Sequence, residues 1–124
     1  MDKIMLPEES YQIVGICMEV HSELGPGFRE EVYKDAVEIE FHRKNIIYQR
    51  ERQFKIEYKG HALKRSYFTD FLVFDKIILE IKAATMMSDQ FIAQTLSYVK
   101  ASGLELGILV NFGQKSLTYK RILV

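Results

Sequence analysis

The amino-acid sequence predicts an α/β fold in which a mixed β-sheet is flanked by helices. Apolar residues recur with a helical period before residue 45, with a period of two from residue 46, and with a helical period again between residues 88 and 102. A helix crossover normally joins parallel strands, so the last helix should add a parallel pair to an otherwise antiparallel sheet. A chain of 124 residues is expected to form one domain, residues 1–124.

Composition and charge leave few classes of protein open. The chain is 48% hydrophobic and 27% charged, as soluble globular proteins are, and its net charge is zero. No apolar run approaches the roughly 20 residues that span a bilayer, and the acidic start is unlike a signal peptide, so we expect a cytoplasmic protein without membrane contact. Cys17 is the only cysteine, which excludes an intrachain disulfide and a thiolate metal cluster and indicates core packing.

Several familiar catalytic motifs are absent from the sequence. No serine lies on a recognisable nucleophile turn, and the glycines after the first expected helix lack the spacing of a nucleotide-binding loop. His21, His42 and His61 do not have the spacing of a zinc site, so we expect surface or packing roles for them.

Two helices are expected in the first third of the chain. Residues 8–24 and residues 28 to about 44 each place apolar side chains on one stripe, and Gly25-Pro26-Gly27 separates them. Glu30 falls in the first turn of the second helix, where an acid usually complements the helix dipole. The alternative is that Glu30 points inward, toward carboxylates supplied by later residues.

Strands are expected from residue 46, where the apolar period changes to two. Residues 46–51 and 53–58 are followed by a turn at Lys59-Gly60, and residues 61–65 lead into a long apolar strand. The almost wholly apolar run 106–111 is typical of a central strand, and residues 116–124 form the last strand. The expected order is helix, helix, three or four antiparallel strands, helix, strand, strand.

A third helix is expected to begin near Ser88, a natural N-cap, and to stop at Gly103. Gln90, Gln94 and Tyr98 recur every four residues and form a polar stripe along it. The stripe either faces solvent or supports a functional site, and the sequence leaves both interpretations open.

The chain is organised around residues 66–85, two apolar strands with ionisable residues where a core would exclude them. The first strand contains Asp70, and the second contains Glu80 and Lys82. Because strand residues two apart share a face, Glu80 and Lys82 project side by side.

The loop of this hairpin decides whether Asp70 joins them. A two-residue loop would turn the carboxylate to the opposite face. We expect a three-residue loop at residues 75–77, which pairs Phe74 with Ile78 and brings Asp70 opposite Lys82.

Three ionisable groups on apolar strands carry a large desolvation cost unless they pair with each other or with a bound cation. Asp70 and Glu80, with a strand carbonyl between them, offer the hard oxygen ligands that Mg²⁺ prefers. The Lys82 ammonium would suit a phosphate or an attacking water. The alternative is a Glu-Lys pair on a solvated strand face.

Basic residues are concentrated in the middle of the sequence. Residues 42–65 contain eight bases and two acids, a net charge of +6, whereas residues 1–41 contain ten acids and three bases. A positive segment beside a carboxylate site would hold phosphates. A solvated basic edge strand that resists aggregation explains the same pattern equally well.

Several runs of residues resemble a known family. Residues 27–33, GFREEVY, have the pattern G-x-x-E-x-x-Y and follow Leu24-Gly25-Pro26; residues 69–73, 79–83, 94–98 and 111–113 complete the match. On these residues the chain, from about Ile13 to Ile122, resembles the GxxExxY proteins, a branch of the PD-(D/E)XK nuclease-like superfamily. Thr69 stands where the superfamily's name has proline, and we expect that position to do no chemistry.

The resemblance implies a restriction-endonuclease-like core and a divalent-metal site for phosphodiester cleavage. It implies that Asp70 and Glu80 bind Mg²⁺ or Mn²⁺ and that Lys82 positions the water and the phosphate. Glu30 and Gln94 would complete the catalytic set as the acid of the flanking helix and a supporting helix residue.

The leading hypothesis is therefore a small metal-dependent nuclease whose partner is a nucleic acid, DNA or RNA. The alternative is a non-catalytic nucleic-acid- or protein-binding domain that keeps the nuclease fold. A third interpretation is a regulatory subunit that works only as a homo-oligomer.

Overall fold

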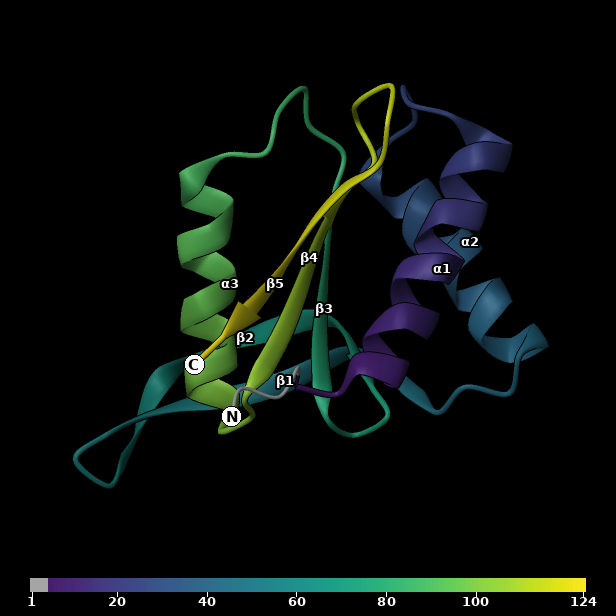
Figure 1. Cartoon of the computed structure of the whole chain (residues 1–124). Helices are drawn as coiled ribbons and strands as arrows, with labels where there is room; N and C mark the ends of the chain where they lie inside the picture. The colour runs from purple at the N-terminus through teal and green to yellow at the C-terminus, as the bar shows by residue number, and fades with distance from the viewer. Residues whose placement is uncertain (1–4) are drawn as a thin grey trace.

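The structure is a computed structural model that describes residues 5–124. Its elements are α1 (Pro7–Leu24), α2 (Glu30–Arg43), β1 (Tyr48–Tyr58), β2 (His61–Val73), β3 (Ile77–Lys82), α3 (Asp89–Ser102), β4 (Leu106–Asn111) and β5 (Thr118–Leu123). The order, and the α/β fold with a mixed sheet flanked by helices, are as the sequence predicts (Figure 1).

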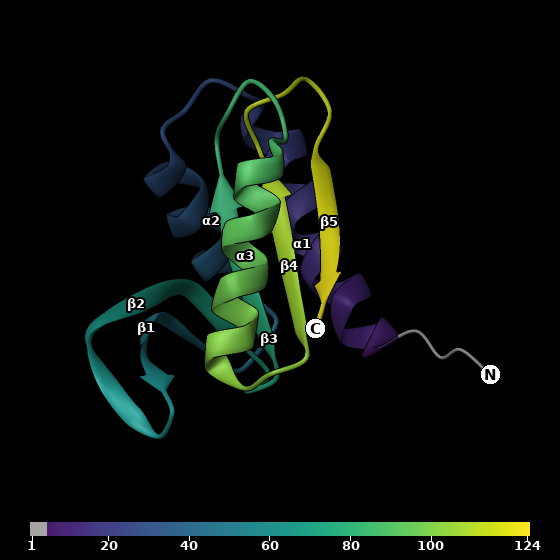
Figure 2. The ribbon, with the colours of Figure 1, turned by 90° about the vertical axis from the view of Figure 1, so that its left-hand side faces the viewer.

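One five-stranded sheet, in the order β1-β2-β3-β4-β5, forms the centre of the fold. Neighbouring strands are antiparallel except β3 and β4, which run parallel from the pair Ile77–Leu106 to the pair Lys82–Asn111. The parallel pair expected from the α3 crossover is therefore confirmed. Helices α1 and α2 cover one face of the sheet and α3 lies against the other (Figures 1 and 2).

The larger apolar cluster fills the space between the sheet and the α1–α2 pair. Its fully buried members include Ile13, Cys17, Val37, Phe41, Phe71, Ile77, Leu79, Ile81, Ile108, Val110 and Phe112. Burial raises the pKa of the Cys17 thiol to about 12, consistent with the expected packing role. A smaller cluster of Leu72, Ile78 and Val99 packs α3 onto the other face.

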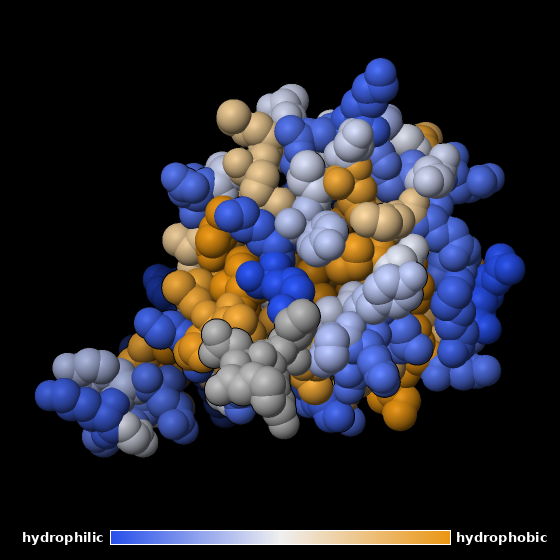
Figure 3. Space-filling model, viewed as in Figure 1, coloured by the Kyte–Doolittle hydropathy of each residue, from blue (hydrophilic) through white to orange (hydrophobic). Residues whose placement is uncertain are grey.

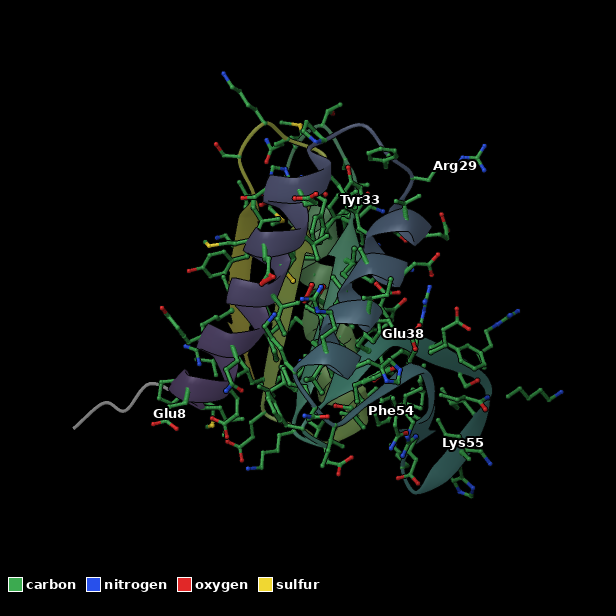
Figure 4. All side chains as sticks on the ribbon, turned by 90° about the vertical axis from the view of Figure 1, so that its right-hand side faces the viewer. Glu8, Arg29, Tyr33, Glu38, Phe54 and Lys55 are labelled. Carbon is green, nitrogen blue, oxygen red and sulfur yellow. The ribbon has the colours of Figure 1, made fainter. Side chains whose placement is uncertain are left out.

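Tyr33 fixes the connection between α1 and α2. Its hydroxyl donates to the Gly25 carbonyl at 2.6 Å and accepts from the Phe28 N–H at 3.2 Å, and its ring stacks on Phe112 at 4.6 Å. Gly27 has φ 109°, a conformation that favours glycine. In Figure 4 Tyr33 lies beneath this connection, whereas Arg29 extends away from the body of the protein. These contacts set where Glu30, the first residue of α2, lies.

The loop between β2 and β3 has three residues, as expected, but it lies one residue earlier than expected. It comprises residues 74–76, and Val73 pairs with Ile77. Phe74 and Asp75 adopt φ values of 58° and 55°, so neither continues an extended strand. The expected pairing of Phe74 with a β3 residue is therefore wrong.

This displacement moves the strand pairing by two residues. The last pair between β2 and β3 is Phe71 with Leu79, and the pairing does not continue to Asp70. The Asp70 N–H bonds instead to the side chain of Glu80. The expectation that Asp70 lies opposite Lys82 is wrong, because the loop begins at Phe74 rather than at Asp75.

β1 is one strand of 11 residues rather than the two runs expected. Glu51, at the end of the first expected run, has φ 56°, a local irregularity that does not end the strand. Lys59-Gly60 forms the expected turn, with φ values of 49° and 79°. In Figure 1 the β1–β2 hairpin crosses the lower end of β3, and its turn projects beyond the rest of the protein at the lower left.

α3 begins and ends as its sequence predicts. The Ser88 hydroxyl accepts the Phe91 N–H at 3.2 Å, and Gly103 follows the last turn with φ 77°. Within residues 5–124, no helix is long and apolar enough to cross a membrane.

Candidate active site

The candidate site is a split between β2 and β3. Beyond the pair Phe71–Leu79, side chains replace the backbone ladder between the two strands. The Asp70 N–H donates to Glu80 Oε2 at 2.9 Å, and the Ile81 N–H donates to Asp70 Oδ2 at 2.7 Å. Both carboxylates are thereby fixed in the gap where the strands separate.

Glu80 is 4% exposed and is held by Thr69, for which we expected no role from the sequence. The hydroxyl of Thr69, itself fully buried, donates to Glu80 Oε2 at 2.6 Å. Thr69 therefore positions Glu80, a contact that a proline at this site could not make because it has no hydroxyl. The bonds from Thr69 and from the Asp70 N–H both go to Oε2, and neither uses Oε1.

The environment of Glu80 favours its protonated form. Burial, and then the neighbouring charge of Asp70, raise the pKa of Glu80 to about 7. The Thr69 hydroxyl, the Asp70 N–H and the Lys82 ammonium act in the opposite direction and lower that pKa. A bound cation would also favour the ionised carboxylate.

Lys34, on α2, is the site residue that the sequence reasoning missed. Its Nζ lies 2.8 Å from Asp70 Oδ1 and 3.1 Å from Glu30 Oε2, and its side chain is 13% exposed. Although burial lowers the pKa of Lys34, hydrogen bonds and charges from Asp70 and Glu30 raise it overall. Glu30 therefore reaches the strand carboxylates through Lys34. The spacing of four residues between Glu30 and Lys34 on a helix was the signal in the sequence that could have indicated this ion pair.

Lys82 and Gln94 meet on the other side of the split. Lys82 Nζ donates to Gln94 Oε1 at 3.2 Å and lies 5.0 Å from the centre of the Phe91 ring. Asp70 is thus contacted from α2, and Lys82 is contacted from α3. The structure places the five residues proposed from the sequence in two groups, one of Glu30, Asp70 and Glu80 and one of Lys82 and Gln94, which are linked through the backbone of β3.

Aromatic side chains line the site toward the β1–β2 hairpin. Tyr98, on the polar stripe of α3, stacks on Tyr67 at 4.2 Å, and Tyr67 stacks on Phe54 at 5.5 Å. Burial, followed by the charges of Glu80 and Asp70, raises the pKa of Tyr98. Gln94 and Tyr98 of the stripe therefore adjoin the site, although Gln94, like Gln90, is exposed to solvent.

Asn111 fixes the segment that follows Lys82. Its side-chain oxygen accepts the Ala84 N–H at 2.9 Å, and its amide donates to the Ala84 carbonyl at 3.0 Å. A Cβ at Gly113 would lie 2.2 Å from the same carbonyl oxygen, so the backbone approaches too closely for any other residue. Asn111 and Gly113 thus have a structural role in positioning the end of β3.

The donor set fits a hard divalent cation. Asp70 and Glu80 provide carboxylate oxygens at the split, and Mg²⁺ commonly takes one or two protein carboxylates and completes its coordination with water and substrate phosphates. Among residues 5–124 no group of three or more His, Cys, Asp or Glu residues is arranged as a metal cage. The positive charge nearest to Asp70 is the Lys34 ammonium.

The family follows from a model match over almost the whole chain. Residues 7–122 match the model of the PD-(D/E)XK nuclease superfamily. The chain belongs to this superfamily. The matched range contains Asp70 and the run Glu80-Ile81-Lys82.

Solved structures share the PD-(D/E)XK fold of this chain at low sequence identity. The crystal structure of SSO0001 is 19% identical with a TM-score of 0.60, over 76% of this chain and 50% of that one. An alkaline exonuclease (LHK-Exo) from Laribacter hongkongensis is 14% identical with a TM-score of 0.55, over 99% of this chain and 72% of that one. The chain thus spans half the length of SSO0001. No curated protein matches it significantly.

Proposed function

We propose that this chain is a nuclease that uses Mg²⁺ or Mn²⁺ to hydrolyse phosphodiester bonds of DNA or RNA. The observation that carries the proposal is the split between β2 and β3, where Asp70 and Glu80 face each other and Lys82 follows two residues later. We also place the chain in the GxxExxY branch. The positive φ of Gly27 and the contacts of Tyr33 give that motif a structural reason.

In this proposal Asp70 and Glu80 hold the cation, and Glu30 adds negative charge from α2. When bound there, a divalent cation would polarise the phosphate and lower the pKa of a water molecule. Lys82 stabilises negative charge that grows on the phosphate in the transition state. Gln94 orients Lys82 through the 3.2 Å hydrogen bond to its ammonium.

Cleavage of labelled DNA and RNA tests the proposal. With Mn²⁺ the wild-type chain should cleave one of these substrates, and EDTA should stop the reaction. Lys82→Ala should lower the rate by at least about a hundredfold, the size expected for losing one preorganised electrostatic group. Its affinity for uncut substrate in Ca²⁺ should change little, because the contact acts in the transition state.

Lys100→Ala is the control, since Lys100 is an exposed lysine in the last turn of α3. It should cleave at the wild-type rate. The nuclease proposal fails if purified wild type cleaves no DNA or RNA with any divalent metal, or if Lys82→Ala cleaves as fast as wild type.

One observation favours the rival function, a non-catalytic binding domain. Lys34 already supplies one positive charge to Asp70 and Glu30, so part of the negative charge of the acidic cluster is neutralised without metal. In a binding domain Lys82 is one more phosphate contact. Lys82→Ala would then weaken nucleic-acid affinity in Ca²⁺ with no activity to lose.

A further inference from the structure

The basic residues of the middle segment divide into two groups in the structure. The first group faces the helices: Arg50 Nη1 lies 2.8 Å from both Asp35 and Glu38, and Lys44 Nζ lies 3.0 Å from Glu40. These charges are neutralised by acids of α1 and α2. They therefore add little to the attraction of an external anion.

The second group lies on the basic arm, which we define as residues 52–68 at the end of the β1–β2 hairpin. The arm contains five bases, Arg52, Lys55, Lys59, Lys64 and Arg65, and one acid, Glu57, a net charge of +4. Within the described part of the chain, no carboxylate lies within 4.0 Å of the charged nitrogens of these bases.

The arm is also the part of the fold that projects from the body. In Figures 1 and 2 its turn lies away from the helices, and in Figure 3 the projecting lobe is largely hydrophilic. Phe54 and Lys55 mark it at the lower right of Figure 4. Large apolar side chains are nevertheless exposed on it: Tyr58 by 60%, Leu63 by 45% and Phe68 by 59%.

This combination distinguishes the arm from a merely protected sheet edge. Lysines alone are enough to keep an edge strand from aggregating, and exposed aromatic side chains oppose that purpose. Basic side chains interleaved with exposed aromatic side chains are typical of surfaces that bind nucleic acid. There the phosphates contact the lysines and arginines, and nucleobases or sugars contact the aromatic rings.

The arm and the candidate site share one strand. β2 runs from His61 to Val73 and contains both Arg65 and Asp70, which are five residues apart. Gly60, in the turn just before β2, is ten residues from Asp70. At about 3.3 Å per residue, these separations are about 17 Å and about 33 Å. The second distance is close to one turn of a nucleic-acid duplex, about 34 Å.

We propose that the basic arm binds the phosphodiester backbone of a nucleic acid whose scissile bond lies in the split between Asp70 and Glu80. The placement of the scissile bond rests on the proposed nuclease function, whereas binding by the arm does not. Lys55, Lys64 and Arg65 contact phosphates within about 20 Å of the site, and the turn at Lys59-Gly60 extends to about one helical turn.

Fluorescence anisotropy in EDTA, where no cleavage occurs, tests the arm with a labelled duplex and a single strand at several KCl concentrations. The test protein is Lys55→Gln/Lys64→Gln/Arg65→Gln. The control is Lys76→Gln/Lys115→Gln/Lys120→Gln, which makes the same change in net charge at exposed positions away from the arm. Circular dichroism should show both variants to be folded, since all six side chains are exposed.

Each lost phosphate contact lowers the slope of log affinity against log salt by about 0.9 for duplex and about 0.7 for single strand. The arm variant should therefore lose about 2.7 and about 2.1 units of slope, and the control less than about one. Equal losses in the two variants, or a wild type that binds neither nucleic acid, would overturn the inference. Arm-dependent binding by a wild type that never cleaves would support the arm and overturn only the nuclease proposal.

Discussion

Lys34→Met tests whether the α2 lysine is the internal counter-ion of the carboxylate site. The substitution keeps most of the apolar stem and removes the charge that lies 2.8 Å from Asp70 and 3.1 Å from Glu30. In the metal-free variant the carboxylates of Asp70 and Glu30 then have no lysine between them. The free energy of unfolding should fall, and affinity for a divalent cation should rise.

The size of both effects follows from burial. Removing one partner of a buried ion pair costs about 3–5 kcal/mol, whereas an exposed pair is worth less than about 1 kcal/mol. The Lys34 and Asp70 side chains are 13% and 16% exposed and that of Glu30 is 33% exposed, which places the site between these limits. We expect a loss of about 2–3 kcal/mol in EDTA. Metal affinity should rise about tenfold, or about 1.4 kcal/mol.

Urea unfolding in EDTA measures the first effect, and calorimetric titration with Mn²⁺ measures the second. Lys44→Met is the matched control, because Lys44 also contacts two carboxylates, those of Glu19 and Glu40, but is 43% exposed. It should unfold at nearly the wild-type urea concentration and leave Mn²⁺ binding unchanged. If Lys34→Met binds Mn²⁺ no more tightly than wild type, Lys34 does not compete with a cation for Asp70.

Further predictions concern Glu80 and its neighbours. Because the folded chain holds the Glu80 proton more tightly than the unfolded chain, the contribution of Glu80 to metal-free stability should be full below about pH 4.5 and be lost as pH rises through about 7. The total loss is about 3 kcal/mol; Glu80→Gln should flatten this decline in urea titrations, and an unchanged decline would contradict the assigned pKa. Thr69→Val removes the 2.6 Å hydrogen bond and should cost about 1–3 kcal/mol at pH 8, by the same assay. A variant as stable as wild type would show that the hydroxyl does not hold Glu80.

Local patterns in the sequence predicted the elements well. The helical period of residues 8–24, the Ser88 cap and the apolar run 106–111 each depend on neighbours along the chain, and each element formed where expected. The strand register could not be obtained in this way. Phenylalanine is common in strands, but Phe74 has a positive φ, so the loop begins one residue earlier than expected. A single backbone conformation thus changed the pairing of β2 with β3 beside Asp70.

The same limit applies to the candidate site. Sequence spacing indicated that Glu80 and Lys82 leave one strand together, but it could not show that Lys34 and Thr69 reach the carboxylates. Those contacts depend on how α2 packs on the sheet and on where β2 and β3 separate. Likewise, the charge pattern of residues 42–65 could not show that Arg50 is neutralised by α2 while the basic arm is not.

Divalent-metal binding by the split between β2 and β3 tests the central claim most directly. Calorimetric titration with Mn²⁺ should give binding to the wild-type chain, and Asp70→Asn should abolish it while circular dichroism stays native. Asp75→Asn, an exposed acid in the adjacent loop, should bind as wild type does. Unchanged Mn²⁺ binding by Asp70→Asn, or no binding by wild type and by Lys34→Met, would contradict the assignment of Asp70 and Glu80 as the metal site.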